Sequence, residues 1–280
     1  MKKASIRIIS TFLVTLLITL SFSGCELLDA IGDSIVDSMY GDALSGGTDE
    51  GDDGFSVEEA INQITTTKMS AAVTLTVNHY NRGTFGLITD SATMLGSGSV
   101  IMKASDITGT KLYVLTNAHC VESLPDRQYK TISMTDYRGN EYTNGTVMPG
   151  SLSEKYDLAV VIFSCTESPT TTVTLAKEDP ERGDTVFAIG SPHAQVNSIT
   201  VGKISAYYQG ELVEVETLYH TAPLGSGGSG GALLNTKLEL CGVNFAADIT
   251  ETDFGNGSSI PIEAVREYLA TLQIFNELLK

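Results

Sequence analysis

Short runs of alternating apolar and polar residues recur through this 280-residue chain, and they constrain its fold more than any other feature. Gly, Asn, Asp or Pro separates most of the runs, as expected where strands end in turns. Because successive side chains of a strand point to opposite faces, such runs indicate β-strands. The predicted strands are residues 73–77, 98–103, 111–117, 158–164, 171–176, 185–190, 198–206, 211–219, 232–236 and 239–246. So many short strands favour a sandwich or a barrel over alternating strand–helix units.

Helical spacing occurs at the two ends of this strand-rich region. Ser56 and Glu59 have the spacing of a capping box, which predicts a short helix over residues 57–68. Pro261 opens a stretch whose apolar residues lie three and four positions apart, which predicts a helix over 261–280. We therefore expect an all-β fold with a short N-terminal helix and a C-terminal helix.

The N-terminus has the layout of an export signal. The only charges before Cys25 are Lys2, Lys3 and Arg7, and the 15 residues 8–22 that follow are apolar apart from Ser and Thr. A bilayer span needs about 20 apolar residues, so this segment suits a signal peptide better than a membrane helix. Its end, Phe-Ser-Gly-Cys, resembles the lipobox of bacterial lipoproteins. The resemblance implies that residues 1–24 are removed and that Cys25 is lipidated; the alternative is an ordinary secretory signal in which this cysteine is incidental.

An acidic segment follows the predicted lipid-attachment site. Residues 26–54 contain nine acidic and no basic side chains, and 41–54 lack apolar periodicity. Such a segment cannot bury enough apolar surface to fold, so we interpret residues 25–54 as a solvated tether, with a short amphipathic helix expected at 27–40. Binding of cations or of a basic partner is the less favoured alternative, because charge runs are usually solvated.

The composition of the chain limits its partners. Thirty-four acidic and 17 basic side chains give a net charge of −17, which argues against a nucleic-acid partner. A hydrophobic content of 42% supports a packed core and excludes a disordered chain. After Cys25 the remaining cysteines are Cys120, Cys165 and Cys241, which allow at most one disulfide and are interpreted as buried free thiols. No tight Cys/His cluster occurs, so no metal is expected.

The sequence GSGGSGG at residues 225–231 is the strongest local signal for chemistry. Composition alone would favour a flexible linker. Strand-like residues flank the run on both sides, however, so we expect a tight turn with Ser229 at its centre. Glycine lets backbone N–H groups converge on one point, as an oxyanion site requires.

The same run also contains the Gly-x-Ser-x-Gly pattern of the α/β-hydrolase nucleophile. That fold places its catalytic His after the Ser along the chain. The four histidines, at positions 79, 119, 193 and 220, all precede Ser229. The α/β-hydrolase alternative therefore fails.

Two further segments supply partners for Ser229. His119 follows a predicted strand, and Asp157 precedes another, where burial of its carboxylate requires a partner such as an imidazole N–H. A Ser hydroxyl needs a base to become a nucleophile, and His is the side chain suited to that at neutral pH. The order His119, Asp157, Ser229 is that of the chymotrypsin-fold template, in which the Asp orients the His.

With these three segments the sequence resembles the trypsin/chymotrypsin-like serine proteases, and within them the bacterial HtrA/Deg type. The resemblance implies a chymotrypsin-like double β-barrel at residues 55–280, with a first barrel at about 70–167, a second at about 168–260 and a C-terminal helix at 261–280. The matching runs are residues 96–101, 114–119, 156–161, 182–192, 199–205, 229–231, 242–244 and 260–261.

The resemblance also assigns roles to further residues. The backbone amides of Gly227 and Ser229 would form the oxyanion hole, and Pro223, Asn244 and Phe245 would form the substrate pocket. No charged residue stands at the pocket positions, which implies small or medium apolar residues before the cleaved bond. Gly228 departs from the Asn that the family commonly has there, and the chain stops at Lys280, so the PDZ domain usual in this type is not expected.

The sequence thus predicts a surface-tethered serine endopeptidase that cleaves exported or misfolded proteins and uses no cofactor. Its partners would be protein or peptide substrates and, through the lipid anchor, a membrane on the extracytoplasmic side of a bacterium. The alternative is an inactive protease homologue that acts as a peptide-binding or surface interaction module.

Overall fold

The computed structural model describes residues 55–107, 109–191, 198–209, 213–248 and 254–280. The predicted signal peptide, the acidic tether and the helix expected at 27–40 lie outside these residues. Within the described part, no helix is both long and apolar enough to cross a membrane.

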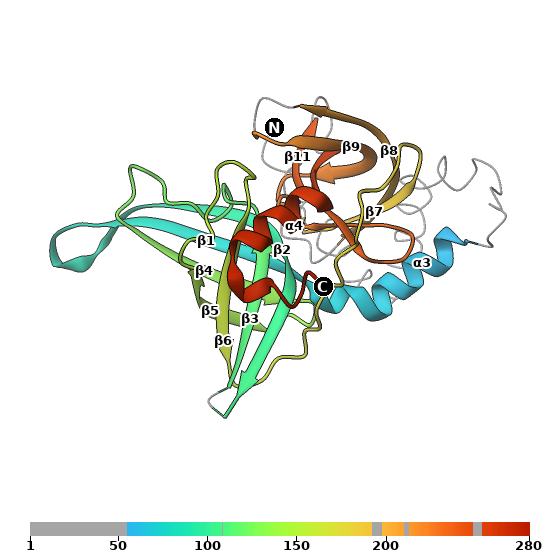
Figure 1. Cartoon of the computed structure of the whole chain (residues 1–280). Coiled ribbons are helices and arrows are strands. Elements are labelled where there is room, and N and C mark those ends of the chain that lie inside the picture. The colour runs from blue at the N-terminus through green and yellow to red at the C-terminus, as the bar shows by residue number, and fades with distance from the viewer. Residues whose placement is uncertain (1–54, 108, 192–197, 210–212, 249–253) are drawn as a thin grey trace, which may run out of the picture. The chain divides into compact units, whose positions relative to one another are not determined.

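Six antiparallel strands form a first closed barrel in the order β1-β2-β3-β6-β5-β4 (Figure 1). The alternating residues Val73, Leu75 and Val77 of β1 are buried in its core, as the period-two pattern predicts. The strands are β1 (Ala72–Arg82), β2 (Ile88–Asp106), β3 (Gly109–Thr116), β4 (Tyr129–Asp136), β5 (Glu141–Val147) and β6 (Ala159–Cys165).

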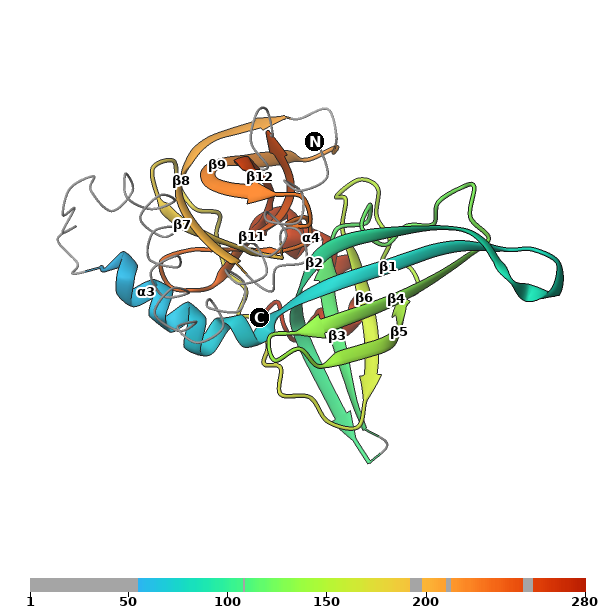
Figure 2. The same ribbon diagram turned by 180° about the vertical axis from the view of Figure 1, so that it is seen from behind.

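Six more strands form a second closed barrel in the order β10-β11-β12-β9-β8-β7 (Figure 2). The strands are β7 (Thr185–Gly190), β8 (Ser198–Gln209), β9 (Glu216–Gly225), β10 (Ala232–Leu234), β11 (Leu240–Asp248) and β12 (Phe254–Pro261). The expected all-β, chymotrypsin-like double barrel with a helix at each end is therefore confirmed.

Strand β3 is buried on both faces, which explains why its sequence is a continuous apolar run. Val114 lies in the core of the first barrel, whereas Tyr113 and Leu115 belong to the other hydrophobic core, which includes the C-terminal helix. The ring of Tyr113 meets that of Phe275 edge-on, with centroids 5.8 Å apart. This double burial fixes β3, whose end leads to His119.

Both helices are shorter than the sequence predicts. Ser56 does cap the first, accepting from the Glu59 amide at 3.3 Å, but the α-helix α3 is only Val57–Gln63. A π-turn η1 (Ile64–Lys68) and a 3-10 turn η2 (Met69–Ala71) follow. The hydroxyls of three consecutive threonines, residues 65–67, donate to carbonyls one turn earlier, a pattern that bends helices.

The C-terminal helix α4 covers Ile262–Thr271 rather than 261–280, and a 3-10 turn η5 (Gln273–Phe275) follows it. Leu272 leaves the helical conformation at φ −104° and ψ 90°. Both Leu272 at the break and Phe275 in the 3-10 turn are buried in the core.

The predicted strand at 171–176 is wrong, and that at 211–219 starts later, at Glu216. The first segment is extended but makes a single bridge, between Leu175 and Leu240, and the Val173 amide donates to Val100 O. Its alternating residues are buried because it crosses between the two barrels. The strands β4, β5, β12 and the first half of β2 were not predicted, because polar residues or glycines dilute their apolar alternation.

Candidate active site

His119 and Asp157 meet at one end of the first barrel, just beyond β3 and just before β6. The ring Nδ1 of His119 lies 2.7 Å from Asp157 Oδ2, and the backbone amide of His119 donates to Oδ1 at 3.0 Å. The His119 side chain is 41% exposed and that of Asp157 only 14%. Both carboxylate oxygens therefore hold the same histidine, and its ring keeps one edge open.

A tight turn presents Asp157 to His119. Asp157 has a positive φ of 49°, which Asp tolerates better than most residues. Its carbonyl oxygen accepts from the Ala118 amide at 3.1 Å and from the side-chain Nδ2 of Asn117 at 2.9 Å. Asn117 is fully buried and was not predicted as a site residue. Its position, a polar residue at the end of an apolar strand, is the sequence feature that could have indicated a role.

The carboxylate of Asp157 changes the acidity of His119. Partial burial of the ring opposes its charged form, but hydrogen bonds to Asp157 and Cys120 and the charge of the carboxylate outweigh that effect. Together they raise the pKa of His119 to about 10. The ring is therefore protonated at neutral pH in this state.

The glycine-rich segment is a tight turn rather than a linker. The amide of Gly228 donates to Gly225 O at 2.9 Å, that of Gly231 to Gly228 O at 3.0 Å, and that of Gly230 to Asn244 O at 2.7 Å. Gly230 has a φ of +85° and Gly227 one of +95°, conformations that only glycine adopts without strain.

Two amides of this turn make no such bond. Neither the Gly227 nor the Ser229 amide donates to another described residue, whereas the amides of Gly228, Gly230 and Gly231 do. The Gly227 and Ser229 amides are the two predicted oxyanion donors. The hydroxyl of Ser229 donates to the Phe245 carbonyl oxygen at 3.1 Å, rather than to His119.

A cavity of about 370 Å³ lies beside His119 and Asp157. His119 and Asp157 line it from the first barrel, and Phe245, the partner of the Ser229 hydroxyl, lines it from β11. The Cys120 thiol lies 3.7 Å from the Ser229 carbonyl oxygen, which links the turn around Ser229 to the residue after His119. The complete lining is Ala118, His119, Glu122, Glu154, Asp157 and Phe245.

The three predicted pocket residues differ in position. Phe245 lines the cavity. Asn244 is fully buried, where its side chain donates to Ala232 O at 3.1 Å and accepts from Ser259 Oγ at 2.9 Å. Pro223 is exposed on β9, and its carbonyl oxygen accepts from Thr200 Oγ1.

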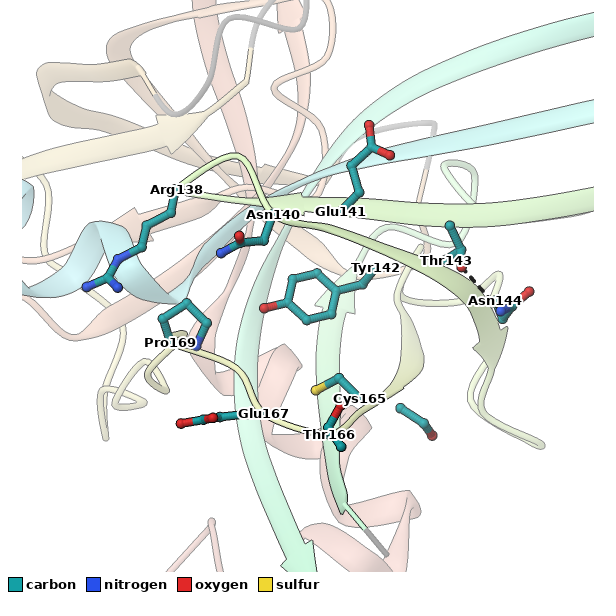
Figure 3. A pocket seen from close by; sticks show the side chains of 11 residues that line it. Arg138, Asn140, Glu141, Tyr142, Thr143, Asn144, Cys165, Thr166, Glu167 and Pro169 are labelled. Atoms are coloured by element: carbon teal, nitrogen blue, oxygen red, sulfur yellow. Dashed lines mark hydrogen bonds between the residues drawn. The ribbon is translucent and has the colours of Figure 1, made fainter.

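A larger hollow of about 650 Å³ lies in the first barrel, around β5 and the segment that follows β6 (Figure 3). The Tyr142 hydroxyl lies near its centre, 3.1 Å from Asp136 Oδ2 and 2.9 Å from Ser168 Oγ. Burial raises the pKa of the Cys165 thiol, and reactive cysteines need the opposite shift. This hollow therefore lacks an activated nucleophile among its described residues.

The described residues offer no group of three His, Cys, Asp or Glu side chains placed to hold a metal ion. Cys120, Cys165 and Cys241 are free thiols.

The geometry of the turn leaves no room for a side chain at Gly230. A Cβ there would overlap the Ser97 carbonyl oxygen and the Thr116 hydroxyl, in addition to the cost of about 1–2 kcal/mol for a left-handed L-residue. We expect Gly230→Ala to lower the free energy of unfolding by about 3 kcal/mol or more, because overpacking adds about 1–3 kcal/mol. Chemical denaturation measures this.

Gly150→Ala is the matched control, since Gly150 also has a positive φ (78°) but nothing within 4 Å of the added Cβ. It should cost only the backbone term. Equal losses in the two variants would show that the close packing of Gly230 has no energetic weight.

Two closed six-stranded barrels, a His–Asp pair at the end of the first and a tight glycine-rich turn around a serine in the second place the chain among double-barrel proteins. The sequence profile of the trypsin-like peptidase domain matches residues 96–243. The chain belongs to this family, and the predicted trypsin-like, HtrA-type resemblance is confirmed at that level.

Curated relatives agree with this assignment. The serine endoprotease DegS of Escherichia coli (strain K12) is 34% identical over 208 residues, which cover 70% of this chain and 54% of DegS. A probable periplasmic serine endoprotease DegP-like of Chlamydia trachomatis is 36% identical over 138 residues, covering 48% and 26% of the two chains. This chain therefore spans between about a quarter and a half of the length of these relatives.

Solved structures share the fold. The HtrA-type protease AlgW with decapeptide superposes with a TM-score of 0.57 at 22% identity, covering 76% of this chain and 67% of that one. The same protease with tripeptide gives 0.57 at 23% identity, with 77% and 63% covered.

Proposed function

We propose that the chain is a serine endopeptidase. The observation that carries this proposal is the 2.7 Å pairing of His119 with Asp157, together with a tight turn around Ser229 in which the Gly227 and Ser229 amides have no described partner. A binding module has no need of that combination. The names of the relatives, serine endoproteases, support the same activity.

In the proposed mechanism the Ser229 hydroxyl leaves the Phe245 carbonyl, turns to His119 and attacks the peptide carbonyl carbon. His119 takes the hydroxyl proton and gives it to the leaving amine, while Asp157 fixes the tautomer and stabilises the imidazolium. A water molecule that gives a proton to His119 then attacks the acyl carbon, the ester bond to Ser229 breaks, and His119 returns the proton to the Ser229 oxygen. The amides of Gly227 and Ser229 donate to the oxyanion, each contributing about 2.7–4 kcal/mol to transition-state stabilisation.

The substrates we propose are exported or misfolded proteins, cleaved after small or medium apolar residues. Phe245 at the cavity supports the apolar preference. The export signal of the sequence and the periplasmic relative support an extracytoplasmic location.

Hydrolysis of fluorescent casein by the purified protein tests the activity, and its pH dependence tests the base. Only neutral His119 can take a proton, and its raised pKa of about 10 leaves little of that form at pH 7. We expect kcat/KM to increase well above pH 6.5, the ordinary value for His, and onward into the alkaline range. A rate that is constant above pH 6.5 would contradict this, and absent hydrolysis would contradict the function.

The tether is the second part of the proposal: Cys25 carries a lipid that holds the protein on the outer face of a bacterial membrane. Radioactive palmitate should label the parent, and Cys25→Ala should lose the label and leave the membrane fraction. Cys165→Ala, which removes a thiol in the folded domain, should behave as the parent. Label retained by Cys25→Ala would refute the anchor.

A further inference from the structure

Ser97 lies in the motif Gly-Ser-Gly at residues 96–98, in the middle of β2 and opposite Thr74 of β1. Its side chain is polar, yet only 1% of the residue is exposed. A buried hydroxyl normally has hydrogen-bond partners that explain its position. The hydrogen-bond partners of this hydroxyl lie in the other barrel.

Ser97 binds the nucleophile turn twice. Its backbone amide donates to the Ser229 carbonyl oxygen at 2.7 Å, and its hydroxyl donates to the Gly227 carbonyl oxygen at 2.7 Å. One residue of the first barrel therefore holds two carbonyl groups of the turn that carries the nucleophile.

Ser97 is itself fixed from two sides. Its hydroxyl oxygen accepts from the Ser191 amide at 2.9 Å, so the hydroxyl hydrogen is left for Gly227. Its carbonyl oxygen accepts from Thr116 Oγ1 at 2.7 Å. The direction of the hydrogen bond to Gly227 is thus determined by neighbours rather than by free rotation.

The two bonds alternate with the proposed oxyanion donors along the chain. The donor N–H groups belong to the peptide planes 226–227 and 228–229, whereas Ser97 holds the planes 227–228 and 229–230. The plane that carries the Ser229 N–H is therefore held on both sides.

The turn needs such support because Gly227 and Gly228 have no side chain to restrict their dihedral angles. Without the hydroxyl bond, the plane 227–228 keeps only the hydrogen bond from the Gly228 amide to Gly225 O among the described residues. Its orientation between two glycines is then less restricted, and the donors on either side lose part of their common direction. Oxyanion stabilisation depends on donors that are oriented before the charge develops.

We propose that Ser97 is a positioning residue that orients the oxyanion donors through the carbonyl of Gly227. The proposal rests on the serine endopeptidase function. Ser97 is buried and acts on the backbone of Gly227 and Ser229, so it affects the transition state and leaves substrate binding alone.

The test compares Ser97→Ala with Ser99→Ala, using fluorescent casein hydrolysis and the rate of fluorophosphonate labelling. Ser97→Ala removes only the hydroxyl and keeps the hydrogen bond from the backbone amide of residue 97 to the Ser229 carbonyl oxygen. Ser99 is buried on the same strand, so its replacement makes the same chemical change without a contact to the nucleophile turn. Losing one oxyanion donor costs about 10²–10³ in kcat, and we expect loss of its support to cost about 10- to 100-fold.

The expected result is that kcat and labelling rate decrease in Ser97→Ala, while KM and the pH profile set by His119 stay unchanged and thermal unfolding shows that both variants remain folded. Equal losses in the two variants would indicate a merely structural hydroxyl and overturn the inference. Labelling of Ser97→Ala at the parent rate would overturn it and leave the endopeptidase function intact. A folded parent that neither cleaves casein nor is labelled would overturn both the role of Ser97 and the endopeptidase function.

Discussion

Replacing Ser229 by alanine is expected to lower kcat for peptide hydrolysis by about five to six orders of magnitude, the scale seen when a triad nucleophile is removed. The reason is chemical, because no other hydroxyl occupies the centre of the turn between the two oxyanion donors. The folded state should change little, since the Ser229 hydroxyl makes one bond, to the Phe245 carbonyl. Casein hydrolysis and thermal unfolding of both proteins measure the two effects.

Ser226→Ala is the matched control. Ser226 is an exposed serine in the same turn, three residues earlier, and should tolerate the change with activity within about twofold of the parent, as exposed substitutions usually do. Substantial activity in Ser229→Ala would show that the nucleophile is another group.

Asp157→Asn is expected to lower kcat by about 10⁴, the loss known for this change in a Ser-His-Asp triad. Asp157 holds His119 with both oxygens, one on Nδ1 and one on the backbone amide. An asparagine amide lacks the charge and presents N–H groups to His119, so it favours the wrong tautomer. The same change removes the largest of the interactions that raise the pKa of His119, so the acid limb of the residual activity should move to lower pH.

Asp126→Asn serves as the control, because Asp126 is an exposed carboxylate of the first barrel, paired with Arg127. Asp126→Asn also removes one carboxylate charge, but at a position that does not contact His119. We expect this variant to retain activity within about twofold of the parent. An Asp157→Asn variant with parental kcat and an unmoved acid limb would refute the role of the carboxylate.

The sequence predicted the fold class because period-two alternation survives in most core strands. Val73, Leu75 and Val77 face one core, and the continuous run of β3 faces two. The polar strands β4, β5 and β12 were missed because each owes its position to barrel closure rather than to its own pattern. The end of α4 was missed for a similar reason. The helix stops at Thr271, and Leu272 is buried in a core formed with residues far away in the sequence.

The sequence predicted His119, Asp157 and Ser229 by residue type and order, and the structure brings the first two within 2.7 Å. The residues that hold the backbone of the site in place could not be predicted from the sequence. Asn117 holds the Asp157 carbonyl from 40 positions away, and Ser97 holds that of Gly227 from 130 positions away. Such contacts depend on how the barrels close and meet, and local spacing carries no trace of them.

Fluorophosphonate labelling of the purified protein, beside its Ser229→Ala variant, tests the central claim most directly. The reagent reacts with a serine only when a base and an oxyanion site activate it. We expect the parent to be labelled, at a rate that increases with pH, and Ser229→Ala not to be labelled. A folded parent that resists labelling, with and without unfolded protein added, would show that Ser229 is not an activated nucleophile and would favour a peptide-binding homologue.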